Sequence, residues 1–229
     1  MKRLLALLSA LVAALPALAA PSVVEAEYKI FKNGILIAYV TEKFERKGET
    51  YRIDSTSVAS GGLKMFVQDK VVMAAEGKFG ASGLQPLVYE DLRTNPNDSV
   101  RLTFDWAKMV LRTKRAGKEE TEPLSRGALD RLSFLYQFMW VTRPDGYKVE
   151  MSGGRKLEAF HFRKAGEPVL KTPAGTFETV HLERIRASDR EDKAQIWLAK
   201  DMGNVPIRIW FQNADGTILD QTIVELKTR

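Results

Sequence analysis

Hydrophobic and polar residues alternate in short stretches along most of the chain, and turn-forming residues separate these stretches. The first clear pair is Val23–Phe31 and Ile35–Phe44, which flank the dipeptide Asn33-Gly34. Asn-Gly favours a tight hairpin because both residues tolerate positive φ angles. The stretch Tyr51–Ala59 alternates in the same way before a serine–glycine turn. The chain is therefore predicted to begin as an antiparallel β-meander.

Similar stretches continue to the C-terminus and predict about thirteen strands, a pattern typical of β-sandwiches and β-barrels. So many strands must hide their edges, so we expect a mainly-β antiparallel meander curved into an open barrel or two wrapped layers. We interpret the longer apolar stretch Leu63–Gly77 as a strand, although Gln68-Asp69-Lys70 interrupts it. The predicted strands are Val23–Phe31, Ile35–Phe44, Tyr51–Ala59, Leu63–Gly77, Leu84–Leu92, Val100–Asp105, Met109–Lys114, Tyr147–Met151, Lys156–Arg163, Phe177–Ala187, Lys193–Ala199, Val205–Phe211 and Thr217–Leu226.

One stretch, Arg126–Thr142, has helical spacing instead. Its apolar residues, including Leu129, Leu132 and Met139, recur three or four positions apart, which is the period of one helix face. Proline and glycine in Arg143-Pro144-Asp145-Gly146 then end the pattern. We predict one central helix over residues 126–142, which divides two strand-rich halves and covers the mouth or the open side of the sheet.

Three polar residues on this helix, Asp130, Ser133 and Gln137, form a narrow stripe at positions i, i+3 and i+7. They either face a cavity and contact a ligand, or serve the fold. In the second case Asp130 stabilises the positive helix N-terminus and the other two bond to strand backbone. Trp197 lies in a predicted strand that is covered on both faces, where it contributes either core packing or an aromatic wall of a ligand site. These four residues are the candidate ligand-binding residues.

The N-terminus has the features of a secretory signal peptide. Lys2 and Arg3 precede the apolar stretch Leu4–Leu15, and Ala17-Leu18-Ala19 provides small residues for cleavage after Ala19. The apolar stretch is shorter than the roughly 20 residues that span a bilayer, and no later stretch approaches that length. The chain has no cysteine, which excludes a lipoprotein anchor. We therefore expect a signal peptide at 1–19 and a soluble periplasmic protein, with residues 20–229 forming a single β-rich domain.

The sequence lacks the motifs that mark metal binding, common catalytic sites and nucleic-acid binding. The two histidines, His161 and His181, have no metal-binding spacing, so no metal site is expected. No Gly-x-Ser-x-Gly motif and no glycine-rich loop that opens a helix is present, so neither a catalytic residue nor a cofactor is predicted. The net charge of +6 is spread along the chain, and its densest basic stretch around Arg112–Lys118 is offset by Glu119 and Glu120. That stretch resembles a solvated hairpin end, and nucleic-acid binding is not expected.

Four segments together resemble one known family. Gly127–Gln137 resembles the central helix of the exported bacterial family catalogued as domain of unknown function 3108, and three later segments fit the same family. The later segments are Thr172–Thr179, Ile196–Asp201 and Val205–Arg208. The resemblance implies that this family covers nearly the whole mature chain, and it brings no assigned reaction.

The leading functional hypothesis is a non-catalytic envelope protein that binds a hydrophobic or lipid-like ligand. Such a ligand fits a cavity under the helix, because the mouths of curved sheets are common ligand sites. One alternative is a protein–protein interaction or envelope assembly module, in which an exposed sheet edge receives a strand from another envelope protein. A further alternative is a hydrolase without a recognisable motif. A cavity under Leu129–Trp140, lined by Asp130 or Gln137, would favour the first hypothesis.

Overall fold

The computed structural model describes residues 20–61, 70–141 and 146–229, which form one large β-sheet with one α-helix. The sheet has sixteen strands, more than the number predicted. The strands are β1 (Val23–Lys32), β2 (Ile35–Lys47), β3 (Thr50–Ala59), β4 (Lys70–Gly80), β5 (Gly83–Leu92), β6 (Val100–Asp105), β7 (Val110–Arg115), β8 (Lys118–Pro123), β9 (Leu129–Asp130), β10 (Tyr147–Ser152), β11 (Glu158–Gly166), β12 (Val169–Thr172), β13 (Gly175–Ile185), β14 (Lys193–Ala199), β15 (Val205–Gln212) and β16 (Ile218–Thr228). The helical elements are α1 (Arg131–Gln137) and the 3-10 turns η2 (Pro96–Asp98) and η3 (Lys200–Met202).

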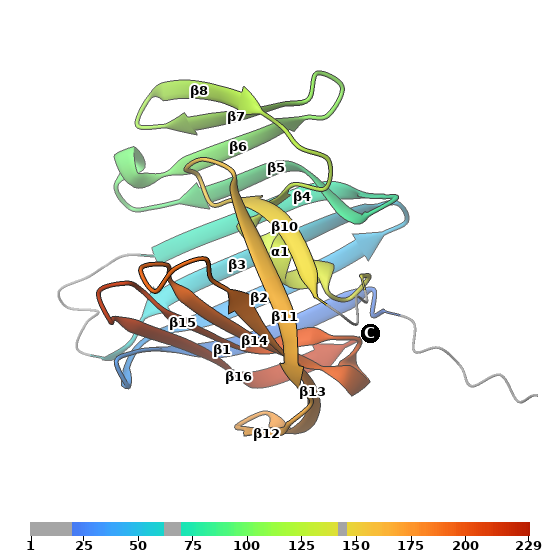
Figure 1. The fold of residues 1–229 in the computed structure, drawn as a ribbon, viewed down its shortest axis with the longest axis vertical. Coiled ribbons are helices and arrows are strands. Elements are labelled where there is room, and N and C mark those ends of the chain that lie inside the picture. The colour runs from blue at the N-terminus through green and yellow to red at the C-terminus, as the bar shows by residue number, and fades with distance from the viewer. Residues whose placement is uncertain (1–19, 62–69, 142–145) are drawn as a thin grey trace, which may run out of the picture.

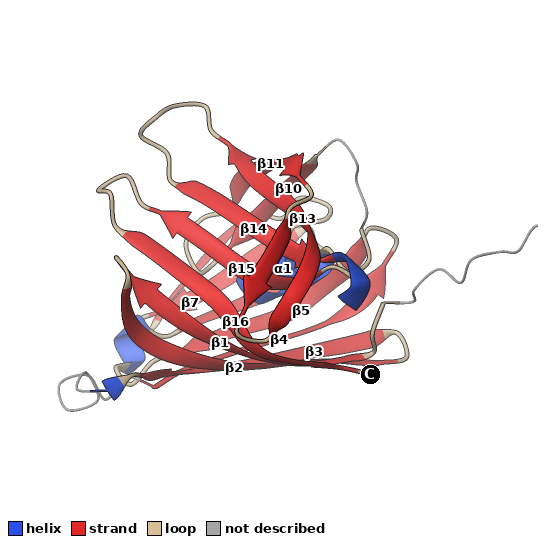
Figure 2. Ribbon diagram, turned by 90° about the horizontal axis from the view of Figure 1, so that it is seen from below, coloured by secondary structure: helices blue, strands red, loops and turns tan. Residues whose placement is uncertain are grey.

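The first strand lies in the middle of the sheet. β1 pairs with β2 on one side and with the last strand, β16, on the other. The strands then follow one another outward, to β8 at one edge and to β9 at the other, while β12 pairs only with β13 (Figure 1). All pairs are antiparallel except β9–β10. Figure 2 shows the sheet curled around α1. The predicted antiparallel, open-barrel architecture is confirmed, and strand pairing does not close the sheet within the described residues.

The edge strand β8 makes contacts across the opening of this curved sheet without pairing there. The backbone N–H of Leu157, the residue before β11, donates to both carboxylate oxygens of Glu122 on β8, each 3.2 Å away. Nearby, Gly154 packs so closely on Val100 that a Cβ atom would lie 2.4 Å from its Cγ1. Side-chain packing and one backbone–carboxylate contact therefore bring the two halves of the sheet together.

Local sequence signals explain most of the hairpins. Asn33 and Gly34 have φ angles of 48° and 81°, which is the conformation expected for an Asn-Gly hairpin turn. The side chain of Asn33 also accepts the backbone N–H of Ile218 at 2.8 Å, so the β1–β2 turn is tied to the start of β16. The predicted hairpin between Val23–Phe31 and Ile35–Phe44 is confirmed, with slightly longer strands.

One strand prediction needs correction, and another can be compared with the structure only in part. The polar stretch at Lys118–Pro123 was assigned to a hairpin end, but it forms β8, which pairs with β7 through partners such as Lys114 and Glu119. Nearly all of β8 is solvent-exposed, so no hydrophobic alternation marks it. Of the predicted strand Leu63–Gly77, only the part from Lys70 onward lies in β4, and residues 62–69 lie outside the described residues.

The predicted helix 126–142 is also wrong in its extent, because α1 covers only Arg131–Gln137. Asp130 is extended, with φ −86° and ψ 173°, and together with Leu129 it forms the short strand β9 beside β10. After Gln137 the chain makes i+3 turn bonds, such as Trp140 N–H to Gln137 O at 3.0 Å. Residues on both sides of α1 are nevertheless buried, so the apolar pattern extends beyond the helix itself.

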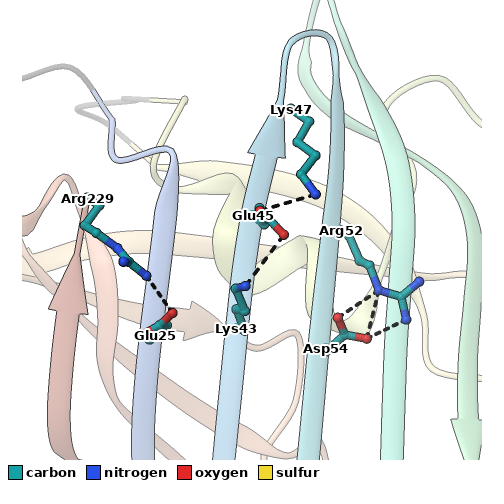
Figure 3. Close-up of polar contacts among 7 residues, drawn as sticks. All are labelled: Glu25, Lys43, Glu45, Lys47, Arg52, Asp54 and Arg229. Carbon is teal, nitrogen blue, oxygen red and sulfur yellow. Dashed lines mark hydrogen bonds and ion pairs between the residues drawn. The ribbon is translucent and has the colours of Figure 1, made fainter.

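Strand alternation gives the sheet a polar outer face. Figure 3 shows ion pairs along the outer side of β1–β3, including Glu25 with Arg229 at 2.8 Å and Lys47 with Glu45 at 3.4 Å. Arg52 donates three hydrogen bonds to Asp54 on the same strand. Exposed pairs of this kind contribute at most about 1 kcal/mol each to stability. The fold therefore depends on the inner face.

The inner face is fully buried where α1 covers it. A row of directly paired residues crosses six neighbouring strands there, and each residue in it has 0% exposure. We call this set the buried row: Val24, Phe44, Ile53, Ala75, Tyr89 and Leu102. It is the centre of the hydrophobic core.

Candidate functional site

Asp130 caps the N-terminus of α1. Its Oδ1 accepts the backbone N–H groups of Leu132 and Ser133, each at 2.9 Å, and its Oδ2 accepts the Ser133 hydroxyl at 2.5 Å. Asp is a preferred capping residue because it satisfies helix N–H groups that have no partner within the helix. Asp130 is completely buried, and burial raises the pKa of its carboxyl to about 6 although the hydrogen bonds from Ser133 and Leu132 lower it.

Ser133 connects this cap to the sheet. Its Oγ lies 2.7 Å from the hydroxyl of Tyr51 on β3, so α1 is held to the inner face by a buried hydrogen bond. The Tyr51 ring lies against Gly77 on β4, where a Cβ atom would be 2.6 Å from the tyrosine hydroxyl. Asp130 and Ser133 thus act together, and both of their side chains are occupied by bonds within the protein.

Gln137, at the other end of α1, binds the turn between β4 and β5. Its Oε1 accepts the N–H of Leu84 at 2.7 Å, and its Nε2 donates to the carbonyl of Ser82 at 2.6 Å. Gly83 between them has φ +102° and leaves no room for a side chain beside the amide. Gln137 also lines a pocket of about 360 Å³, whose other polar lining residues are Ser82, Ser125, Arg126, Tyr147, Lys148, Glu150 and His161.

A buried acid that the sequence reasoning missed lies beside this network. Glu42 on β2 is 4% exposed; it accepts the Tyr136 hydroxyl and the Ser55 hydroxyl, each at 3.1 Å. Burial raises its pKa, while the hydrogen bonds from Tyr136 and Ser55 oppose the shift. A sequence signal existed, because Glu42 has the same strand parity as Val40 and Phe44 and must face inward with them.

Aromatic side chains occupy the space between α1 and the sheet. The Phe44 ring stacks on Tyr136 at a centroid distance of 5.3 Å and lies 5.1 Å from Trp140. It also stacks on Tyr51 at 6.3 Å, and Phe79 meets Trp140 edge-on at 5.0 Å. The region directly under the helix is thus packed core, and a hydrophobic ligand needs another surface.

Trp197 lies apart from the other three candidate residues. It is 9% exposed on the outer face of β14, stacked on His181 with 4.4 Å between ring centroids. The Arg208 guanidinium lies over the same ring at 4.8 Å and is held by two hydrogen bonds to Asp220. The structure therefore brings Asp130 and Ser133 together, places Gln137 at the far end of α1, and puts Trp197 in an outer-face stack.

The inner face changes character away from α1. A second row of directly paired residues crosses five strands near the turns that join β1 to β2 and β15 to β16, and these residues are only half-buried. We call this set the open row: Ile209, Gln221, Ile30, Ala38 and Ala59. The row continues to Ile196 and Leu182, which are buried. Here the sheet presents an apolar inner surface that α1 does not cover, and we take it as the candidate ligand site.

No group of three or more histidine or acidic side chains is arranged to hold a metal ion in residues 20–61, 70–141 and 146–229. In the same residues, none of the helices has the length and apolar character that a bilayer crossing requires.

A curved, unclosed antiparallel sheet around one short helix defines a barrel-like class of β-protein. The fold is similar to the crystal structure of a beta-barrel-like protein of the domain of unknown function DUF1849 from Brucella abortus, with a TM-score of 0.59 and 8% sequence identity. The similarity covers 92% of this chain and 99% of that chain. No curated protein matches the sequence. Residues 24–223 match the family described as protein of unknown function (DUF3108), and the chain belongs to that family.

Proposed function

We propose that this protein is a non-catalytic periplasmic envelope protein that binds a hydrophobic, lipid-like ligand on the inner face around the open row. The observation that carries the proposal is the half-buried state of Ile209, Ile30 and Ala38, which face inward. On β1 and β2 the inward residues next to them, Tyr28 and Val40, are buried. The signal-peptide features of residues 1–19 support export.

The residues of this surface suit an acyl chain. Ile30 and Ile209 are aliphatic, while Ala38, Ala59 and the inward residue Ser57 are small. Burial of one methylene group contributes about 0.8 kcal/mol, so a chain of about ten methylenes gains about 8 kcal/mol before the cost of ordering. Apolar burial is therefore the driving force that we propose for binding.

Exposed apolar residues gather at the same end of the sheet. Of the seven large hydrophobic side chains that are exposed in the described residues, five lie at the ends of strands on this side of the molecule. Their exposed fractions are Ile35 68%, Tyr39 41%, Val58 38%, Leu92 47% and Ile185 51%. Strand alternation puts Tyr39, Val58 and Ile185 on the outer face, opposite the open row. This end of the sheet therefore carries apolar side chains on both faces, and exposed apolar patches mark interaction sites.

Strand addition by a partner protein is less well supported. The edge strand β8 carries Glu119, Glu120 and Glu122 and ends at Pro123, and charges and proline on an edge strand disfavour pairing with another chain. Its Glu122 side chain also binds the backbone N–H of Leu157. The edge strand β8 therefore gives little support to an assembly role, and we favour ligand binding.

The proposal is tested with the mature protein and the uncharged fluorescent probe N-phenyl-1-naphthylamine. We expect saturable binding of the probe, displacement by long-chain alcohols, and loss of binding in Ala38→Trp, which fills the open row. Thr41→Trp places the same ring on the outer face of β2 and should bind normally. Circular dichroism shows whether each variant folds, and Ala59→Leu is a milder second block. A folded native protein that binds no probe, or equal binding by both tryptophan variants, would overturn the proposal.

A further inference from the structure

A cation-lined pocket lies next to the open row. Its volume is about 510 Å³, and it forms at the ends of three neighbouring strands, β11, β13 and β14. Four of its eight lining residues are cationic and one is acidic. The lining residues are Arg163, Glu183, Arg184, Ile185, Arg186, Lys193, Ala194 and Gln195.

The pocket opens where two strands separate. The pairing of β13 with β14 ends at Glu183 and Gln195, and the next residues along each strand diverge toward the turn that joins them. Leu182 is buried on the inner face, so strand alternation places Arg184 on the inner side and Glu183 on the outer side. Residues from both faces consequently line the pocket: Arg184 and Ala194 border the inner face, and Lys193 lies on the outer side with Glu183.

Arg184 is the cation that faces inward. Its guanidinium lies over the Phe160 ring at 4.6 Å, and only 12% of its side chain is exposed. It donates to Glu191 at 3.2 Å and to the Asp192 carbonyl at 3.4 Å, which leaves further N–H donors of its five free for a ligand. A planar guanidinium fixed on an aromatic ring is well suited to bind an acidic group.

The other cations are bound to different extents. Arg163 pairs with Glu183 at 3.0 Å, and Arg186 bonds to the β13–β14 turn, including Asp189 at 3.2 Å. Lys193 forms no ion pair with any described residue. The pocket thus contains an ammonium group without an ion pair on its outer side and a guanidinium on its inner side.

We propose that the ligand is an amphipathic anion, with its acyl chain on the open row and its acidic head group, a phosphate or a carboxylate, between Arg184 and Lys193. This assignment rests on the proposed function, because the chain occupies the same inner face. Hydrogen bonds between charged groups are stronger than neutral ones, and the exposure of Lys193 to solvent reduces its share. We therefore expect the acidic head group to strengthen binding about tenfold.

The test compares dodecyl phosphate, dodecanoate and dodecanol as competitors of the same fluorescent probe at low salt. In the native protein the two anions should displace the probe at about tenfold lower concentration than dodecanol does. Lys193→Gln should remove part of this advantage without changing dodecanol binding, and Arg163→Gln should have a smaller effect because Arg163 is already paired. Lys78→Gln, which removes an exposed cation on β4 outside the pocket, is the matched control and should leave all three affinities unchanged.

Each outcome decides a separate point. If dodecanol binds as tightly as the two anions, the head-group assignment is wrong and the proposed function stands. If none of the three competitors binds, the proposed function itself fails. Inorganic phosphate should displace dodecyl phosphate only at far higher concentration; equal potency would identify the pocket as a site for free phosphate and overturn the amphipathic assignment. An effect of Lys78→Gln equal to that of Lys193→Gln would show general charge attraction and would also overturn it.

Discussion

The buried row and the open row share strands β1–β3 and lie on the same face of the sheet, yet only one of them is core. Val24, Phe44 and Ile53 are fully buried on β1–β3, whereas Ile30 and Ala38 on β1 and β2 are half-buried. The difference is that α1 and its aromatic neighbours cover the first set. A seven-residue helix therefore decides which half of a continuous apolar face becomes core and which half is left for a ligand.

The region around α1 also differs from the open row in its buried, hydrogen-bonded polar side chains. Around α1 every buried polar side chain has a partner, and no buried side-chain nitrogen or oxygen in the described residues lacks a hydrogen bond. Asp130, Ser133 and Tyr51 form one linked set, and Glu42 with Tyr136 forms another. Fully satisfied buried networks of this kind favour one fixed arrangement, so we expect rigidity at α1 and adaptability at the open row.

The largest expected effect is a loss of stability, which should be greater for a truncation in the buried row than for one in the open row. Phe44→Ala removes a ring that packs on three aromatic neighbours, and it should lower the free energy of unfolding by about 3–5 kcal/mol. Ile30→Ala should cost about 1–2 kcal/mol, because part of its side chain is already exposed. Urea unfolding monitored by circular dichroism measures both. Equal costs would show that the open row is as much a part of the core as the buried row.

The buried carboxyl of Asp130 predicts a pH dependence that belongs to the helix region. Its pKa of about 6 lies above the ordinary value of 3.8, so the folded state favours the protonated form. The resulting stability is complete below about pH 4 and is lost as the pH rises through 6, with a change of about 2–3 kcal/mol in the free energy of unfolding.

Asp130→Asn isolates this contribution, because asparagine is an equally good capping residue but does not titrate. Urea unfolding at pH 4 and pH 7 should show a smaller loss of stability in the variant than in the native protein. Glu42 has a raised pKa in both proteins and contributes equally to each. Identical pH profiles would contradict the raised pKa of Asp130.

Two glycines of β4 test how tightly the sheet packs beneath α1. A Cβ atom at Gly77 would lie 2.4 Å from the Gln85 carbonyl and 2.6 Å from the Tyr51 ring, whereas one at Gly80 would make only ordinary contacts of 3.6 Å or more. Gly77→Ala should therefore destabilise the protein by about 1–3 kcal/mol, and Gly80→Ala by much less. Thermal unfolding of the pair provides the comparison, and similar melting temperatures would argue against close packing at Tyr51.

The smallest expected loss of stability follows from the removal of single serine hydroxyl groups. Ser133→Ala removes the bonds to Tyr51 and Asp130 and should cost about 1–2 kcal/mol. Ser57→Ala, on the inner face beside the open row, should change stability by less than about 0.5 kcal/mol. If the two substitutions cost the same, the hydroxyl network does not hold α1 to the sheet.

Sequence patterns predicted the sheet better than the helix, for physical reasons. Strand alternation and turn chemistry are local, so the Asn33-Gly34 hairpin could be recognised without its neighbours. The limits of α1 depend on tertiary contacts, because Leu129 and Asp130 pair with β10 instead of continuing the helix. The strand β8 could not be found by hydrophobic alternation, since it is an edge strand exposed on both faces.

The candidate site was only partly accessible to the same reasoning. The stripe Asp130, Ser133 and Gln137 was recognised as one set, but its partners Tyr51, Ser82 and Leu84 come from other strands and depend on register. The open row could not be identified at all, because residues of five strands define it only after the sheet has formed. Trp197 was placed in a strand correctly, but its outer-face stack with His181 and Arg208 depends on the register of three strands.

The central position of β1 has a consequence for the order in which the molecule is built. β1 pairs with β16 along its whole length, so residues such as Val24 and Thr228 meet across nearly the entire sequence. Pairings this distant in sequence make folding slow, because the chain must lose the entropy of closing a long loop before the stabilising contacts can form. Until β16 arrives, one side of β1 stays an unpaired strand edge, which is a route to aggregation. Synthesis of the last strand therefore completes the middle of the sheet, and a chain that lacks it keeps an open edge beside its own core.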